Sequence, residues 1–236
     1  NSDAKITFTP YIDAGITNED TNWDDQFWDV LEVSQNNQQS FIKARTMKTH
    51  FYTCTFMESK LFIDDKEVIT GCNNEKTSNY TACNYQQEIK QHQTYTIQKF
   101  GGYVVDRNHT KKELVTAAKN ILDKAVSFGF DALLEMQKQS WAQIWNMSDI
   151  TISGDVKAQQ GIRFNIFQLN QTYLGTDATL NIGPKGFTGE KYGGSTYWDT
   201  EAYCIPFYMA TKDQSVARTL LEYRYNHLDK AIENAE

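Results

Sequence analysis

The feature that most constrains the fold is a change in hydrophobic spacing near Asn108. Before it, segments such as KITFTPYIDA, SFIKARTMK and HFYTCTFMESKLFI are short, rich in β-branched and aromatic residues and separated by polar turns, a pattern typical of antiparallel strands. After it, apolar residues recur at helical intervals. Because strand and helix patterns occupy separate parts of the chain, we predict a multi-domain β + α protein. The strand segments predict part of a β-sandwich over residues 1–107.

The helical patterns directly after this change form a predicted linker over residues 108–154. Thr110-Lys-Lys-Glu113 is a capping-box pattern and precedes a predicted helix that ends at Gly129. A second predicted helix covers residues 131–146.

Beyond the linker, residues 155–236 predict three more helices, at residues 156–174, 196–210 and 214–234. Three helices around a long loop do not close a core by themselves. We therefore expect this chain to be one part of a larger protein.

A glycine-rich loop separates the first two of these helices. Six of the chain's 13 glycines lie between Gly175 and Gly194, and glycine allows positive φ and close approach of a ligand. The loop leads into Thr196-Tyr-Trp-Asp199. Two interpretations stay open: Asp199 caps a helix that begins near Thr196, or Trp198 and Asp199 line a pocket. In such a pocket the indole would stack on a sugar ring and the carboxylate would accept hydroxyl hydrogen bonds.

Charge and hydropathy exclude several classes of partner. The net charge of −7 argues against nucleic-acid binding. The sequence holds no apolar run of about 18 residues, so we expect no membrane span. The opening NSDAKITFTP lacks the pattern of a secretory signal, and we expect a cytoplasmic protein.

The cysteines and histidines predict no metal site. The four cysteines form no C-x-x-C pair, and the four histidines are scattered. Cys72 and Cys83 flank a polar loop and could bridge in an oxidising compartment, but a chain of this length needs no disulfide. Both states stay open.

Two long segments carry a resemblance to a known family. QGIRFNIFQLNQTYLG and NIGPKGFTGEKYGGSTYWDTEAYCIPFYMAT closely resemble glycoside hydrolase family 65, whose members include maltose, trehalose and kojibiose phosphorylases. The run GPKGFTGEKYGGSTYWDTE is similar to the maltose phosphorylase type. The resemblance is strong from about Gln160 onward and more diffuse over residues 1–150.

The resemblance implies an architecture in which an N-terminal β-sandwich is joined by helices to an (α/α)6 barrel. Residues 155–236 would then supply the first helices of that barrel, which is incomplete here. Because such a barrel closes by packing helices around a ring, we expect several apolar side chains to be short of neighbours. These side chains are Phe164, Phe167, Tyr203, Phe207, Tyr208 and Leu221.

The same resemblance implies which residues bind substrate. Trp198 and Asp199 match the family's Trp-Asp pair, which contacts the glucose unit released from the disaccharide. We add Tyr197, Glu190 and Lys191, from the same run, as candidate substrate-binding residues. The family's general acid is a glutamate in a downstream motif that does not occur before residue 236, so this chain holds no candidate catalytic residue.

For the whole protein the resemblance implies inverting phosphorolysis of an α-glucosidic, maltose-like disaccharide to β-glucose 1-phosphate and glucose. Inorganic phosphate would be the co-substrate, with no cofactor and no metal, and the protein would form a homodimer through the sandwich. A related trehalose hydrolase and a non-catalytic carbohydrate-binding relative are the alternatives. We expect the chain alone to be inactive.

Overall fold

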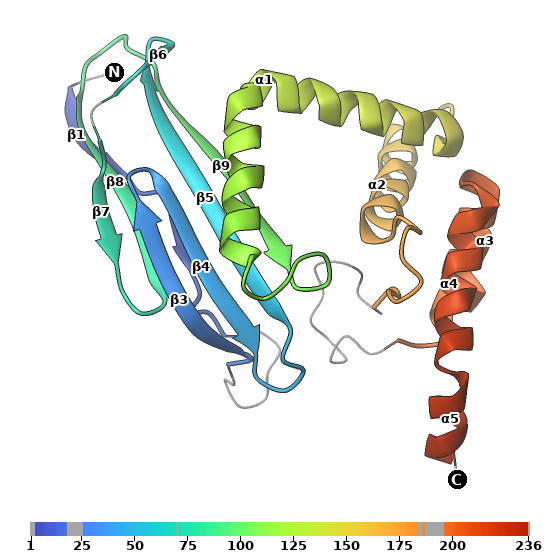
Figure 1. Ribbon diagram of the computed structural model, residues 1–236. Coiled ribbons are helices and arrows are strands. Elements are labelled where there is room, and N and C mark those ends of the chain that lie inside the picture. Colours follow the sequence, from blue (N-terminus) through green and yellow to red (C-terminus); the bar gives the residue numbers. More distant parts are fainter. Residues whose placement is uncertain (1–2, 18–25, 70, 184–185, 187–195, 236) are drawn as a thin grey trace. The chain divides into compact units, whose positions relative to one another are not determined.

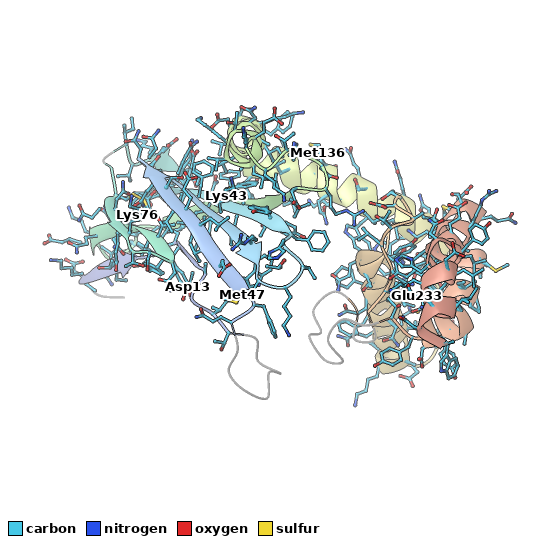
Figure 2. The ribbon with its side chains drawn as sticks, turned by 60° about the horizontal axis from the view of Figure 1, so that its bottom comes forward. Asp13, Lys43, Met47, Lys76, Met136 and Glu233 are labelled. Atoms are coloured by element: carbon cyan, nitrogen blue, oxygen red, sulfur yellow. A yellow bond between two sulfur atoms is a disulfide. The ribbon has the colours of Figure 1, made fainter. Side chains whose placement is uncertain are left out.

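The computed structural model describes residues 3–17, 26–69, 71–183, 186 and 196–235 (Figure 1). The chain divides into two compact units, Asn1–Glu135 and Met136–Glu236. The division falls within one helix, where Met136 begins the second unit (Figure 2). Each unit is described by itself.

The first unit is a pair of antiparallel sheets, as the strand patterns predict. One sheet has the order β1-β8-β2, with β7 also paired to β8, and the other has the order β3-β4-β5-β6, with β9 also paired to β5. The strands in the described residues are β1 (Ala4–Phe8), β2 (Tyr11–Asp13), β3 (Trp28–Asn36), β4 (Gln39–Thr46), β5 (Tyr52–Ile63), β6 (Lys66–Glu67), β7 (Asn73–Lys76), β8 (Tyr80–Ile89) and β9 (Tyr95–Val105).

The long strand β5 is the centre of the larger sheet. It pairs with β4 from Gln39↔Glu58 to Arg45↔Tyr52 and with β9 from Thr53↔Val105 to Ile63↔Tyr95. Alternate residues of a strand face the same side of the sheet. The side chains of alternate residues on β5 and β9 therefore lie on the same side of the larger sheet, and together they form one apolar face.

The helix α1 (Leu114–Ser148) begins directly after the sheets, and its first part covers this face beside β5 and β9 (Figure 1). Its contribution to the core is a stripe at intervals of four residues, and each fully buried Leu stabilises the fold by about 1.5–3 kcal/mol. The buried cluster consists of Phe41, Cys54, Phe56, Phe100, Val104, Leu114, Ala118 and Leu122.

Gly129 interrupts α1 with non-helical φ and ψ of 76° and 167°. The predicted end of the first linker helix at Gly129 is therefore confirmed, and a second helical segment follows it. Glycine is needed because this region of φ and ψ is closed to other residues.

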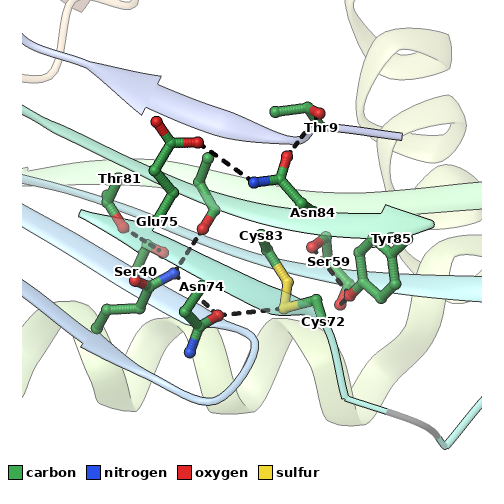
Figure 3. Close-up of a disulfide and its surroundings, with 12 residues drawn as sticks. Thr9, Ser40, Ser59, Cys72, Asn74, Glu75, Thr81, Cys83, Asn84 and Tyr85 are labelled. Atoms are coloured by element: carbon green, nitrogen blue, oxygen red, sulfur yellow. Dashed lines mark hydrogen bonds between the residues drawn. A yellow bond between two sulfur atoms is a disulfide. The ribbon is translucent and has the colours of Figure 1, made fainter. Parts of the chain in front are cut away.

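The smaller sheet carries a disulfide between Cys72 and Cys83 (Figure 3). The two Cα atoms are 5.4 Å apart, a separation suited to a disulfide. Cys83 lies on β8 and is fully buried beside Leu61 and Tyr85. The sequence left open whether Cys72 and Cys83 form a disulfide, and in this structure they do.

The regular elements among the described residues of the second unit are all helices. They are the end of α1, α2 (Val156–Thr172), the π-helix η2 (Thr200–Cys204), α3 (Ile205–Thr211), α4 (Gln214–Asn226) and α5 (Leu228–Ala235). Its core joins α3 and α4 to the segment that follows α2, through Tyr173, Ile182, Tyr208, Val216 and Leu220.

The helix predicted over residues 196–210 differs from the structure. It begins with the π-turn η2, in which Ile205 N–H donates to the carbonyl of Thr200. The cause is Pro206, which lies in the first turn of α3. Its ring removes one N–H donor and clashes with the carbonyl four residues earlier, so the turn before it opens.

The helix predicted over residues 214–234 is also divided, at His227. The His227 ring nitrogen Nδ1 lies 2.8 Å from the Tyr223 carbonyl, which the His227 N–H would otherwise meet in a continuing helix. That N–H instead donates to the carbonyl of Arg224 at 3.1 Å. A histidine side chain can end a helix by occupying one of its last carbonyls.

We expected six apolar side chains of the incomplete barrel to be short of neighbours, and the structure bears this out for four of them. Phe164, Phe167, Tyr203 and Leu221 are exposed. The prediction is wrong for Tyr208, which is fully buried in the core of the second unit, and Phe207 packs against that core.

Candidate functional site

The predicted site residues Tyr197, Trp198 and Asp199 lie directly before η2. All three residues are exposed, Trp198 by 67% and Tyr197 by 43% of the full surface of their residue types. Glu190 and Lys191 lie outside the described residues. The structure therefore brings together one aromatic pair and one carboxylate on consecutive residues.

Backbone hydrogen bonds hold this segment as the first turn of a helix. The Trp198 carbonyl accepts from the N–H groups of Glu201 and Ala202, both at 3.1 Å. Thr200 is buried, and its hydroxyl donates to the Ile182 carbonyl at 3.4 Å. The buried Thr200 anchors the turn to the core, and the side chains before it face outward.

Among the described residues, the aromatic neighbour of the Trp198 indole is Tyr203. Its ring centroid lies 6.1 Å from that of Tyr203, at an angle of 43°. Tyr203 is itself exposed. Two tilted rings on a helix start leave apolar faces open to a ligand with C–H groups to stack.

The capping interpretation of Asp199 stays a prediction. The Trp198 carbonyl accepts from the N–H of Ala202, so Asp199 is the first residue of the helical turn and not the third, as a helix from Thr196 would make it. Its backbone is helical, with φ −54° and ψ −33°, and within the described chain its side chain makes no capping hydrogen bond. A capping residue has an extended backbone and bonds to an N–H of the first turn. Within the described chain the Asp199 carboxylate therefore makes no N-cap hydrogen bond.

Arg224, in the last turn of α4, contacts the backbone and side chains around this turn. Its Nε and one terminal nitrogen donate to the two carboxylate oxygens of Glu201 at 2.7 and 3.1 Å. Its other terminal nitrogen donates to the Thr196 hydroxyl at 3.0 Å, and the first also reaches the Tyr197 carbonyl at 2.6 Å. Sequence patterns missed Arg224, because its partners lie 23 to 28 residues away and no local spacing links them.

The titratable groups here do not supply a nucleophile. Burial raises the pKa of the Cys204 thiol, and the nearby charges of Glu201 and Asp199 raise it further. The thiol is therefore protonated at neutral pH and unreactive. Burial likewise raises the pKa of Tyr208. In the part of the chain that the structure describes, no group of three or more His, Cys, Asp or Glu residues could hold a metal ion.

These properties suit binding of a polyhydroxyl ligand. Exposed indole and phenol rings offer stacking faces, and the adjacent carboxylate offers acceptors for hydroxyl groups. Acid–base chemistry would need a further group near the bond to be broken.

Comparison with known proteins identifies the family. Residues 1–144 match the family model described as the N-terminal domain of glycosyl hydrolase family 65, and residues 163–236 match the model of its central catalytic domain. The chain belongs to glycosyl hydrolase family 65. The resemblance seen in the sequence is therefore confirmed, as is the fold class of a β-sandwich followed by helices.

Several relatives within family 65 carry named activities. The maltose phosphorylase of Bacillus subtilis (strain 168) is 40% identical over 233 residues, which cover 99% of this chain and 30% of that protein. The alpha,alpha-trehalose phosphorylase of Thermoanaerobacter brockii is 31% identical over 100% of this chain and 31% of its own length. The chain spans about 30% of the length of these relatives.

A solved structure has the same fold. It is a human-microbiome protein provisionally described as a kojibiose phosphorylase, with a TM-score of 0.82 and 26% sequence identity over 97% of this chain and 29% of that chain. The family models leave a gap at residues 145–162. The predicted boundaries after residues 107 and 154 stay predictions.

Proposed function

We propose that this family 65 chain is part of an inverting disaccharide phosphorylase that cleaves a maltose-like α-glucosidic disaccharide. The observation that carries the proposal is the exposed Trp198–Asp199 pair, whose carboxylate makes no N-cap hydrogen bond within the described chain. The 40% identity to a maltose phosphorylase supports the choice of disaccharide.

In this proposal the pair binds the glucose unit that is transferred. The Trp198 indole stacks on the C–H face of the pyranose, and the Asp199 carboxylate accepts hydrogen bonds from its hydroxyls. Tyr197, Glu190 and Lys191 contribute further substrate contacts.

The bond-breaking step needs groups that this chain does not supply. A carboxylic acid elsewhere in the protein protonates the glycosidic oxygen, and a phosphate oxygen attacks the anomeric carbon from the opposite face. The products are glucose and β-glucose 1-phosphate. An inverting hydrolase needs a second carboxylate to activate water, whereas phosphate is already an anionic nucleophile. Residues 155–236 begin the (α/α)6 barrel that holds this reaction, and the chain alone is inactive.

We further propose that the enzyme uses phosphate as co-substrate without a cofactor or metal, binds neither nucleic acid nor membrane, and forms homodimers in the cytoplasm. The described helices include none long and apolar enough to cross a bilayer. Disulfides are rare in the cytosol, so in that location Cys72 and Cys83 would be held largely as thiols.

The test uses the full-length protein that contains this chain. Maltose, kojibiose, nigerose and trehalose are each incubated with and without phosphate, and the products are followed by proton and phosphorus NMR. We expect glucose release to require phosphate, to be fastest with maltose and to yield the β anomer of glucose 1-phosphate. Release of glucose at the same rate without phosphate would establish a hydrolase instead, and the α anomer would exclude inversion. The 236-residue chain alone should give neither product.

A further inference from the structure

We propose that Arg224 is a positioning residue for the donor-sugar side chains Trp198 and Asp199. This inference rests on the proposed function, because it assigns Arg224 a role through those two residues. Arg224 itself need not touch the sugar.

The geometry places Arg224 on both sides of the pair. Before the pair, it binds the Thr196 hydroxyl at 3.0 Å and the Tyr197 carbonyl at 2.6 Å. After the pair, it binds the Glu201 carboxylate through two nitrogens. The four residues between Thr196 and Glu201 are thus fixed at both ends by one side chain.

The turn that carries the pair needs such support. It runs into the π-helix η2, and π-turns are rare and frequently occur at functional sites. Glu201 is one of the five residues of η2. Holding Glu201 therefore fixes the turn whose first residues present Trp198 and Asp199.

Only an arginine side chain can make this set of bonds together. The guanidinium is a planar fork with five N–H donors, whereas lysine carries a point charge that cannot bond two carboxylate oxygens, a hydroxyl and a carbonyl in these directions. The Arg224 and Glu201 side chains are 34% and 27% exposed. Ion pairs with this access to solvent contribute little to stability. The hydrogen bonds of Arg224 therefore act chiefly by fixing the conformation of the turn that carries Trp198 and Asp199.

The test is a double-mutant cycle in the full-length protein, with the disaccharide that it cleaves fastest. The variants are Arg224→Lys, Asp199→Asn and the two combined. Arg218→Lys is the matched control, since Arg218 lies on the same helix α4 and, among the described residues, its ion pair runs along that helix to Glu222. Melting temperature is measured for each variant beside kcat and KM.

We expect Arg224→Lys to lower kcat/KM by about tenfold or more, since small misplacements of binding groups have large kinetic effects. In the Asp199→Asn background the same change should cost clearly less, because residues that act through one another are not additive and only the positioning of Trp198 is left to lose. Arg218→Lys should stay within about twofold of wild type. A purely structural role would lower the melting temperature and would lower kcat/KM equally in both backgrounds.

Each failure has a distinct signature. Normal kinetics for Asp199→Asn would remove the proposed sugar site, and this inference with it. A normal Arg224→Lys enzyme beside an impaired Asp199→Asn enzyme would overturn the positioning role alone, as would equal losses in both backgrounds. If Arg224→Lys does not fold, Thr196→Val removes one of the same bonds without removing the charge. Thr196→Val should show a smaller loss than Arg224→Lys, and this loss should again be reduced in the Asp199→Asn background.

Discussion

Asp199 is the residue at which a structural and a functional role can be separated. The T-x-x-D pattern favoured a cap as strongly as a sugar contact, because both need a carboxylate at the start of a helix. In the structure Asp199 is the first residue of the helical turn instead of the third, and within the described chain it makes no N-cap hydrogen bond. Pro206, seven residues further on, opens the π-turn that follows Asp199, and a capping pattern read alone does not include it.

The exchange Asp199→Asn tests the remaining role. It keeps the shape of the side chain and removes its charge. A hydrogen bond to a charged group contributes about 1.5–3 kcal/mol, so weakening two of them should lower kcat/KM by about 10²-fold or more. Melting temperature should change little, since the side chain caps no helix. Both quantities are measured on the full-length enzyme, and a kcat/KM within about threefold of wild type would count against the sugar contact.

At the scale of elements, the sequence was informative wherever a local rule decides the outcome. The change of period near Asn108 separates strands from helices, and Gly129 breaks α1 where predicted. The sequence was not informative where contacts between residues far apart in the chain decide the structure. The Arg224 bonds to Glu201 and Thr196 join α4 to the site turn, and the His227 side chain divides a continuous helical pattern. Neither can be inferred from periodicity.

The break in α1 gives a matched pair of glycine substitutions. Gly129 has φ +76° and open space around an added Cβ, whereas Gly161, inside α2, has open space and no positive φ. Gly129→Ala should therefore destabilise by about 1–3 kcal/mol through backbone strain alone. Gly161→Ala should stabilise by about 0.5–1 kcal/mol. Urea unfolding of each variant measures both effects, and a destabilising Gly161→Ala would show that space, not backbone conformation, limits these sites.

The disulfide between Cys72 and Cys83 joins the segment before β7 to the strand β8. We therefore expect reduction of this bond to lower the stability of the fold. Cys72 and Cys83 are 11 residues apart, and closing a loop of this length stabilises a fold by about 3 kcal/mol. Dithiothreitol should lower the melting temperature of the wild-type chain by about 5 °C or more, whereas Cys72→Ser should already melt at the lower temperature and not respond.

Thiol counting supplies the control for this prediction. The described free cysteines are Cys54 and Cys204, so the denatured, unreduced chain should react with a thiol reagent at two cysteines and the reduced chain at four. Four reactive thiols without reductant would show that the bridge does not form under those conditions.

At the scale of the whole molecule, the two units differ in how well they cover their apolar side chains. The first unit has buried clusters on the α1 side of the larger sheet and beside the disulfide. The second unit has one small core, and large apolar side chains along its last two helices are exposed. Exposed apolar patches of more than a few hundred Å² mark sites of association. We therefore expect the chain to associate through the exposed apolar side chains of the second unit.

The exposed side chains of α4 and α5 recur along the sequence as Leu221, Tyr225, Leu228 and Ile232, each about half exposed or more. We expect the 236-residue chain on its own to associate at micromolar concentration, because burying such side chains gains about 25 cal/mol per Å². Sedimentation velocity at increasing concentration measures this. Replacing Tyr225 and Ile232 together by Lys should shift the chain toward monomer, whereas Ile69→Lys, at an exposed apolar residue of the first unit, should not. A wild-type chain that stays monomeric at the highest concentration would show that these side chains do not drive association.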